Sequence, residues 1–271
     1  MGLKMHRPVT AGQRFMVTQT FEDLTKKPPE KRLTKGQRER SGRNNQGKIT
    51  VRRKGGGCKR SFRTIDFSMK KEGVTGKVVS VEYDPNRTCR IALIKYNDGD
   101  KRYITAPKEL KIGNEITNGE NVSLTTGNCM SLKNIPVGTF IYNVQLDKNK
   151  NAQLARSAGT YAQILAKEGD FANIKLPSGE VRRFSVDCKA CIGQVGNLEH
   201  SAIRISKAGK SRHMGRRPKV RGVAMNPIDH PLGGGEGRSS GGRHPCSPWG
   251  KLERKTRKKK LSDKYIVKRR K

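Results

Sequence analysis

The chain has 271 residues, of which 59 are Lys or Arg and 23 are Asp or Glu, so its formal net charge is +36. This excess of positive charge favours a polyanionic partner such as a nucleic acid. No apolar run approaches the ~20 residues of a membrane span and the first fifteen residues lack the apolar stretch of a secretory signal, so we expect a cytoplasmic protein.

The positive charge is concentrated at the two ends of the chain. Residues 1–60 hold 17 basic and 4 acidic residues, and residues 201–271 hold 22 and 4. The 140 residues between them hold 20 and 15. This distribution predicts a nearly balanced middle part with a basic extension on either side.

The N-terminal extension contains the stretch RSGRNNQGKITVRRKGGGCKRSFRTIDF. Its glycines let the backbone approach a partner closely, and its Arg and Lys side chains can neutralise phosphates. A disordered basic tail is the alternative, because runs of like charge are usually solvated. We favour specific binding, because a tail that merely attracts a polyanion does not need the amides and glycines of GRNNQG.

Residues 74–107 alternate with period two and are interrupted by turn residues. The stretch TGKVVSVEYD places Val79, Val81 and Tyr83 on one face, and CRIALIKY and KRYITAP follow after the turn sequences DPNR and NDGD. This pattern predicts a three-stranded meander. Pro107 ends the last strand, because proline cannot donate a hydrogen bond to a neighbouring strand.

A second β region begins at NIPVGTFIYNVQLD, where Phe140, Tyr142, Val144 and Leu146 alternate. The stretch TYAQILAKEGDFANIKLPSGEVRRFSVD predicts three more strands, broken at residues 168–170 and 177–179. Short strands at this spacing favour small barrels over one large sandwich, and two barrels of roughly 60–70 residues fit the available length.

We therefore expect a mainly β protein with two small β-barrels in tandem and long irregular basic N- and C-terminal extensions. The expected domains are an N-terminal extension at residues 1–60, barrels at 61–125 and 126–196, and a C-terminal extension at 197–271.

The C-terminal extension is predicted to begin with a short helix over residues 197–207, with Asn197 as its N-cap. Its last 21 residues hold 12 basic and 2 acidic residues and, taken alone, also suit a nuclear signal or a nonspecific nucleic-acid tail. The two extensions contain few aromatic rings, so stacking on bases is not the expected mode of contact. Contacts with phosphate, ribose and overall shape fit a folded RNA better.

Five motifs resemble one known family. GRNNQGKITVRRKGGG, IALIKYNDGDKRYITAPKEL, GNCMSLKNIPVGT, QLARSAGTYAQI and GVAMNPIDHPLGGGEGR occur in the order found in the ribosomal protein L2 family of the large subunit, in its bacterial form. The resemblance runs from about residue 40 to the C-terminus. It implies an oligonucleotide-binding-type (OB-like) barrel followed by an SH3-like barrel, and two extensions that thread into rRNA. It also implies a primary rRNA binder that supports subunit association and reaches toward the peptidyl-transferase centre.

By this resemblance, MNPIDHPLGGGEGR is the segment nearest the peptidyl-transferase centre. Gly and Pro give it a path that no helix or strand follows, and rRNA is expected to supply its order. His230 lies beside Asp229 and invites a role as general base. The alternative is that His230 hydrogen-bonds rRNA and shapes the loop. We favour this alternative and assign no catalytic residue, because no nucleophile can be identified nearby and the family's reaction centre is made of RNA.

The sequence departs from the usual family pattern in three places. Leu232 stands where a second His is common, in HPHGGG, and Cys58 stands where GGGHK is usual. His213-Met214 replaces a pair that commonly begins with Trp. Leu232 can neither donate nor accept a proton, which argues against a mechanism with two histidines.

Cysteine spacing and a glycine run raise two further possibilities. Cys188 and Cys191 have the C-x-x-C spacing of zinc and redox sites, but a zinc site needs two more ligands and His200 is the only nearby candidate. We expect no metal and no cofactor. GGGEGR lacks the Gly-Lys-Ser/Thr ending of a phosphate loop, so nucleotide hydrolysis is not expected. The other cysteines are expected to be reduced, as small apolar residues: Cys58, Cys89, Cys129 and Cys246.

The sequence thus predicts a non-enzymatic, RNA-binding constituent of the large ribosomal subunit, located in the ribosome. Its expected partners are rRNA, the small subunit across the subunit interface, other ribosomal proteins and a nearby tRNA, with no membrane. Two alternatives stay open: a free accessory factor of transcription or translation with salt-labile binding, and an enzyme with His230 as base. The residues expected to contact RNA are Arg43, Asn44, Asn45, Lys48, Arg52, Arg53, Lys54, Lys59, Arg60, Arg63, Arg212, Arg216, Arg217, Arg221, Asn226, Asp229, His230 and Arg238.

Overall fold

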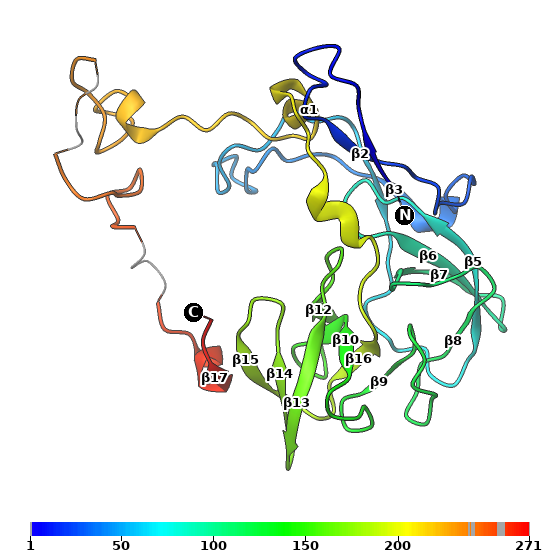
Figure 1. Ribbon diagram of the computed structural model, residues 1–271. Coiled ribbons are helices and arrows are strands. Elements are labelled where there is room, and N and C mark those ends of the chain that lie inside the picture. The colour runs from blue at the N-terminus through cyan, green and yellow to red at the C-terminus, as the bar shows by residue number, and fades with distance from the viewer. Residues whose placement is uncertain (1, 238, 240–241, 254–257, 271) are drawn as a thin grey trace. The chain divides into compact units, whose positions relative to one another are not determined.

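The computed structural model describes residues 2–237, 239, 242–253 and 258–270. The chain divides into two units (Figure 1). The first, here called the body, comprises Met1–Arg38, Lys59–Ala208 and Tyr265–Lys271. The second, here called the extension unit, comprises Glu39–Cys58 and Gly209–Lys264. Within the described residues, no helix is long and apolar enough to cross a membrane.

The first main sheet of the body contains the predicted meander. Its strands follow the order β7-β6-β5-β8 and are all antiparallel. Gly99 has a φ of 84° and closes the turn between β6 and β7 by donating its N–H to the Tyr96 carbonyl. The predicted meander is confirmed, with a short fourth strand added. The bounds are β5 (Gly76–Glu82), β6 (Ile91–Tyr96), β7 (Lys101–Thr105) and β8 (Glu115–Ile116).

A bulge in β5 changes which of its side chains face the core. The register with β6 shifts between Val78 and Ser80. Val78 and Val81 are therefore buried in one cluster, whereas Val79 is half-buried and Tyr83 is 50% exposed. The predicted face of Val79, Val81 and Tyr83 is wrong at two of its three positions, because Val79 lies at the bulge, where strict alternation breaks, and Tyr83 lies beyond the end of β5.

The second main sheet has seven strands in the order β17-β15-β14-β13-β10-β16-β9. The three strands predicted in its middle are confirmed as β13, β14 and β15, and Figure 1 shows them side by side. Ile141, Ile164, Ile174 and Phe184 fill its core. The bounds are β9 (Cys129–Ser131), β10 (Phe140–Tyr142), β13 (Ala162–Glu168), β14 (Phe171–Lys175), β15 (Val181–Ser185), β16 (Lys189–Ile192) and β17 (Ile266–Lys268).

Asn143 interrupts the strand that the alternation of residues 140–146 predicts. Its φ of 50° ends β10, and the chain continues as β11 (Val144–Gln145), which pairs with β12 (Ala152–Leu154) in a separate sheet. Tyr142 and Val144 are buried, but Phe140 and Leu146 are 49% and 39% exposed. The expectation of one regularly alternating strand is therefore wrong, since a left-handed residue breaks the period.

The first 38 residues form strands with each other and with the body. β1 (Leu3–Met5) pairs with β2 (Val17–Gln19), and β3 (Thr34–Gly36), which follows the 3₁₀ helix η1 (Lys31–Leu33), pairs with β4 (Ser61–Arg63). Leu24 and Leu33 pack against core clusters of the first main sheet. Apolar side chains thus anchor this part of the N-terminal extension.

Residues 197–207 form a shorter helix than expected. The 3₁₀ helix η2 (Leu198–Ala202) follows Asn197, which has a left-handed φ of 63° and makes no capping hydrogen bond. Its amide instead donates to the Thr88 carbonyl and accepts from Gln19. The predicted N-cap is wrong, because these tertiary contacts occupy the side chain. The remaining helices are α1 (Ala208–His213), η3 (Gly222–Ala224) and η4 (Leu261–Tyr265).

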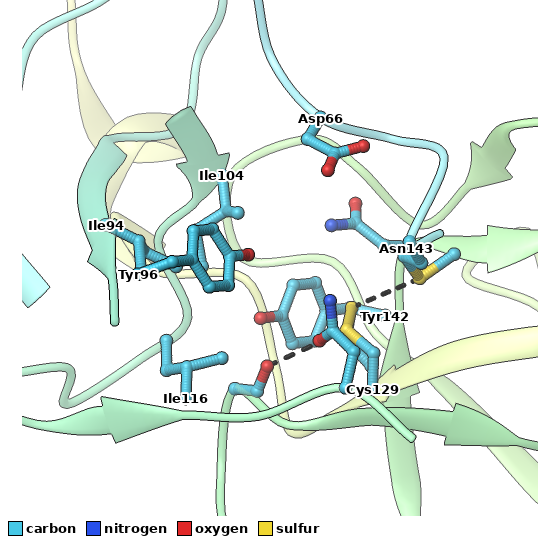
Figure 2. A pocket seen from close by; sticks show the side chains of 12 residues that line it. Asp66, Ile94, Tyr96, Ile104, Ile116, Cys129, Tyr142 and Asn143 are labelled. Atoms are coloured by element: carbon cyan, nitrogen blue, oxygen red, sulfur yellow. Dashed lines mark hydrogen bonds between the residues drawn. A yellow bond between two sulfur atoms is a disulfide. The ribbon is translucent and has the colours of Figure 1, made fainter. Parts of the chain in front are cut away.

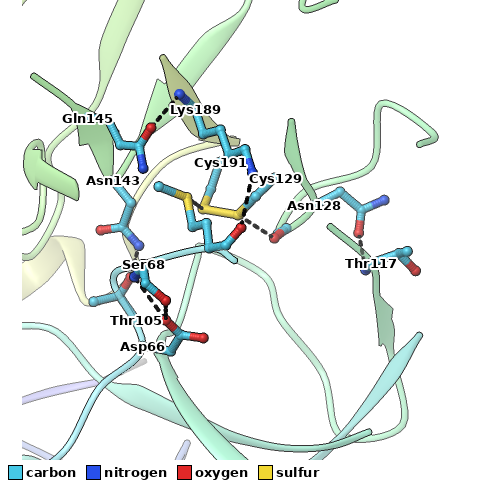
Figure 3. Close-up of a disulfide and its surroundings, with 12 residues drawn as sticks. Asp66, Ser68, Thr105, Thr117, Asn128, Cys129, Asn143, Gln145, Lys189 and Cys191 are labelled. Carbon is cyan, nitrogen blue, oxygen red and sulfur yellow. Dashed lines mark hydrogen bonds between the residues drawn. A yellow bond between two sulfur atoms is a disulfide. The ribbon is translucent and has the colours of Figure 1, made fainter. Parts of the chain in front are cut away.

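Cys129 and Cys191 are joined by a disulfide between facing positions of β9 and β16 (Figure 3). The expectation that Cys129 is reduced is wrong, because sequence spacing does not show which strands become neighbours. Cys58, Cys89 and Cys188 are free, as is Cys246.

The two cysteines of the C-x-x-C motif belong to different core clusters. Cys188 packs with the core of the seven-stranded sheet, whereas Cys191 packs with Met69 and Tyr142. Among the described residues, no group of three or more His, Cys, Asp or Glu side chains is placed to hold a metal ion.

Candidate nucleic-acid interface

The GRNNQG stretch forms a closed loop, here called the first loop (residues 40–51). The side-chain oxygen of Asn44 accepts the backbone N–H groups of Gln46 and Lys48 at 3.0 and 2.9 Å. Arg43 donates from Nη1 to the Gly47 carbonyl at 2.7 Å. Asn side chains commonly order turns in this way. Asn44 therefore acts on the loop's own backbone, while Asn45 and Lys48 are exposed.

The two basic stretches, far apart in sequence, pair through their backbones. Gly55 donates its N–H to the Gly215 carbonyl at 3.0 Å, and Cys58 donates to the His213 carbonyl at 2.9 Å. Arg217 donates to the Arg53 carbonyl at 3.1 Å. We call this pairing of residues 53–58 with 213–217 the basic ladder. It unites parts of both predicted extensions in one structural unit.

Gly57 makes this close approach possible. A Cβ atom at this position would lie 2.9 Å from the Gly215 nitrogen and 3.0 Å from its Cα atom. These distances are shorter than ordinary contacts, so a side chain here would push the two backbones apart. The glycine run thus has a structural role in the ladder that charge alone would not predict.

The basic ladder presents its cations outward. Six predicted RNA-contacting residues in and beside it are exposed, and none of these six forms an ion pair with another described residue. Several cations of the body are by contrast paired with carboxylates, as in the pairs Lys71–Asp98 and Arg102–Asp66. Like charges held close together repel, so this arrangement is suited to phosphate groups. The six residues are Arg52, Arg53, Lys54, Arg212, Arg216 and Arg217.

Two of the departures from the usual family residues lie against one another in the ladder. The Cys58 sulfur lies 3.8 Å from Nδ1 of His213, in addition to the backbone hydrogen bond between the two residues. Two of the positions at which the sequence departs from the family, Cys58 and His213, are therefore in contact with each other.

His230 is buried within a second loop (residues 221–237), with 7% of its surface exposed. Its Nδ1 accepts the backbone N–H of Leu232 at 3.1 Å, so the proton of the neutral ring lies on Nε2. A Cβ atom at Gly222 would lie 2.4 Å from the same ring nitrogen, so the imidazole rests directly on the Gly222 backbone. The ring thus holds the turn together.

Backbone hydrogen bonds close the rest of this loop. The Asn226 carbonyl accepts from Asp229 at 3.0 Å and from His230 at 3.3 Å, and Gly234 donates to the Met225 carbonyl at 3.0 Å. A Cβ atom at Gly233 would lie 2.3 Å from the Asn226 oxygen. The sequence led us to expect that rRNA orders this segment. The loop's own hydrogen bonds supply part of that order.

The remaining predicted contact residues are spread over both units. Lys59, Arg60 and Arg63 belong to the body, where Arg63 donates from Nη1 to the Thr34 hydroxyl at 3.0 Å. Arg221, Asn226 and Asp229 are exposed on the second loop. Arg238 lies outside the described residues.

The body also carries a pair of exposed aromatic rings that the sequence alone does not bring together. Phe21 and Tyr83 meet edge to face with centroids 5.7 Å apart, and the Arg90 guanidinium lies 5.0 Å from the Phe21 ring. Both rings are about half exposed. Tyr83 directly follows the end of β5 at Glu82, and the alternation of the strand does not reveal its outward position.

Two family models match the chain. The model described as "Ribosomal Proteins L2, RNA binding N-terminal domain" matches residues 30–118, which include the first loop and the four-stranded sheet. The model described as "Ribosomal Proteins L2, C-terminal domain" matches residues 125–250, which include the second loop and most of the seven-stranded sheet. Because both models match, in order and over most of the length, the chain belongs to the ribosomal protein L2 family and is an rRNA-binding structural constituent of the large ribosomal subunit, not an enzyme.

Proposed function

We propose that the chain binds folded large-subunit rRNA through the basic ladder and the two loops. The observation that carries this proposal is the pairing of residues 53–58 with 213–217, which leaves Arg52, Lys54 and Arg216 exposed without ion pairs among the described residues. Phosphate oxygens can neutralise this cluster, and the contacts fix position without reading sequence.

The individual residues have different roles in this proposal. Arg and Lys side chains of the ladder and of the first loop neutralise phosphates, and Asn45 and Asn226 hydrogen-bond ribose or phosphate groups. Asn44 and His230 act by holding their loops in the bound conformation, since their side chains bond to the loops' own backbones. A preformed loop loses less conformational entropy on binding.

The proposal also extends to the finer features that the family resemblance implies. The chain is of bacterial type, with an extension at residues 1–60, barrels at 61–125 and 126–196, and an extension at 197–271. The second loop approaches the peptidyl-transferase centre, and a tRNA lies near it. The chain also contacts other ribosomal proteins and supports association with the small subunit. The preformed, positively flanked shape of the second loop supports its placement in rRNA.

Sedimentation of the tagged full-length chain through a sucrose gradient, with and without a high-salt wash, tests the proposal. We expect it to remain with the large subunit at one copy per subunit after the wash, because interlocked contacts are shielded from salt. Crosslinking should then join rRNA to both the ladder and the second loop. Release of the chain by salt would instead support an accessory factor with surface contacts, and crosslinks confined to the body would overturn the proposed interface.

A further inference from the structure

A small cavity lies between the two main sheets of the body. Ile94, Tyr96 and Ile116 line it from the four-stranded sheet, and Cys129 and Tyr142 line it from the seven-stranded sheet. The space that the centre of a water molecule can occupy is about 20 Å³. This is enough for one water molecule, since a single one needs about 10–15 Å³ by the same measure.

Two polar atoms of residues that line this cavity lack a partner. The Tyr142 hydroxyl and the Asn143 side-chain oxygen are buried and have no hydrogen-bond partner among the described residues. Tyr142 is fully buried and Asn143 is 4% exposed. Figure 2 shows the hydroxyl of Tyr142 pointing inward beside the ring of Tyr96. Buried polar atoms without a partner are rare in folded proteins, because losing their hydration is costly.

A different orientation of Asn143 does not remove the problem. Its side-chain nitrogen donates to the Thr105 hydroxyl at 2.5 Å. If the carboxamide were turned over, its oxygen would accept from that hydroxyl and its nitrogen would be left without an acceptor. In either orientation one amide atom needs a partner that can donate or accept, and water does both.

We propose that this cavity binds one structural water molecule, which links Tyr142 to Asn143 between the two main sheets. Tyr142 donates its hydroxyl proton to the water, and the water donates to the Asn143 oxygen. Asp66 and Asn118 also line the cavity and offer oxygen atoms for a further bond. Burial raises the pKa of the Tyr142 hydroxyl, so this group remains protonated and able to donate.

The site gives Asn143 a role beyond its turn. Its left-handed backbone ends β10 and sends the chain into β11, and Asn tolerates that conformation better than most residues. The same residue bonds Thr105 on the four-stranded-sheet side of the cavity. The bound water therefore completes the hydrogen bonds of a residue that itself links the two sheets, at the point where β10 ends.

The test compares Tyr142→Phe with Tyr161→Phe in the full-length chain. Both variants remove one hydroxyl and keep the ring, but Tyr161 is 43% exposed and does not line the cavity. In crystals or large subunits that resolve ordered water, we expect density about 2.7–3.0 Å from the Tyr142 oxygen. The density should persist in Tyr161→Phe and weaken or vanish in Tyr142→Phe.

The melting temperature gives a second test, because the direction of its change distinguishes a hydroxyl that binds water from one that has no partner. If Tyr142 binds water, Tyr142→Phe should melt a few degrees below the unmodified chain, whereas Tyr161→Phe should have the melting temperature of the unmodified chain. If the hydroxyl has no partner, Tyr142→Phe removes an unsatisfied group and should melt at the same temperature or higher. That result overturns the proposal. Density in the cavity at metal-ligand distances would overturn the proposal as well. So would a map that resolves other buried waters but shows no water density in this cavity.

Discussion

At the scale of single residues, His230 has the most specific structural role in the extension unit. Its Nδ1 accepts the Leu232 N–H and its ring lies on Gly222, so the imidazole supports the second loop from inside. We expect His230→Ala to reduce incorporation into large subunits and peptide-bond formation together. His230→Asn should restore much of both, because its side-chain oxygen can replace Nδ1 as acceptor. Gradient profiles and peptidyl-transfer assays on purified subunits measure the two effects.

Gly222→Ala serves as the matched variant for His230. It leaves the imidazole in the chain, but its Cβ atom would lie 2.4 Å from the ring and displace it. If His230 acts by holding the loop, this variant should behave like His230→Ala. Normal incorporation of His230→Ala and His230→Asn, with peptidyl transfer lost in both, would instead indicate proton transfer by the ring.

Asp66 supplies a pH-dependent contribution to the stability of the body. Burial raises the pKa of this carboxyl group, but hydrogen bonds from Ser68 and from Arg102 more than offset the effect, so the pKa lies below its ordinary value of 3.8. The Arg102 Nη1 atom lies 2.7 Å from the carboxylate. A lowered pKa in the folded state means that this contribution is complete above pH 3.8 and is lost as the pH falls through the folded value.

We therefore expect Asp66→Asn to lower the melting temperature of the full-length chain above about pH 4. The difference from the unmodified chain should shrink as the pH falls further. Asp170→Asn, which alters an exposed carboxyl group, should show little difference at any pH. Melting temperatures measured from neutral pH down to pH values below 3.8 check this prediction. A difference between Asp66→Asn and the unmodified chain that stays constant down to the lowest pH would contradict it.

At the scale of structural elements, the basic ladder depends on the absence of a side chain at Gly57. The Cβ of Gly57→Ala would lie 2.9 Å from the Gly215 nitrogen, which forces residues 53–58 away from 213–217. We expect this variant to weaken rRNA binding several-fold, because the cations of the two segments would no longer be held together. The melting temperature of the body should hardly change, because Gly57 lies outside it.

Gly209→Ala provides the control for the ladder. Gly209 lies in α1, and a Cβ atom there meets nothing within 4 Å. Alanine favours helix more than glycine, so this substitution should leave binding unchanged or improve it slightly. Filter binding with large-subunit rRNA measures both variants. Equal affinities for Gly57→Ala and Gly209→Ala would show that the ladder does not shape the binding surface.

What could be predicted from the sequence follows the distinction between local and tertiary signals. The turn residues around Gly99 and at residues 177–179 are local, and the strands that they separate are confirmed. The β5 bulge and the left-handed Asn143 each shift the alternation within one strand, which period-two counting cannot detect. The ladder and the Cys129–Cys191 disulfide join distant segments, and single-sequence patterns carry no information on such pairing.

The candidate site shows the same division. Charge together with the family resemblance selected the residues around Arg53 and Arg216 as candidates, because phosphate binding needs exposed cations. They could not show that the two groups share one ladder, nor that Asn44 and His230 bond to their own loops. Those roles depend on hydrogen-bond geometry, which only the folded backbone defines.

At the scale of the whole molecule, the positive charge is spread unevenly along the chain. The middle of the chain holds 20 basic and 15 acidic residues, and several of its cations pair with neighbouring carboxylates. If only the net charge of +36 mattered, and not the positions of the individual cations, rRNA would be attracted to every face of the molecule alike. We propose instead that a few positions, the exposed cations of the ladder, account for most of the binding to phosphate.

This difference can be measured with two charge-matched double variants. Arg52→Ala with Lys54→Ala removes one cation beside the ladder and one within it, whereas Lys148→Ala with Lys175→Ala removes two exposed cations of the body, between β11 and β12 and at the end of β14. We expect the first variant to bind large-subunit rRNA more weakly. Its plot of log affinity against log salt should be shallower by about 0.9 for each phosphate that the variant no longer neutralises. The second variant should keep the original slope, because the proposed interface does not include its lysines. If both variants show the same reduction in affinity and in slope, net charge rather than the ladder governs binding.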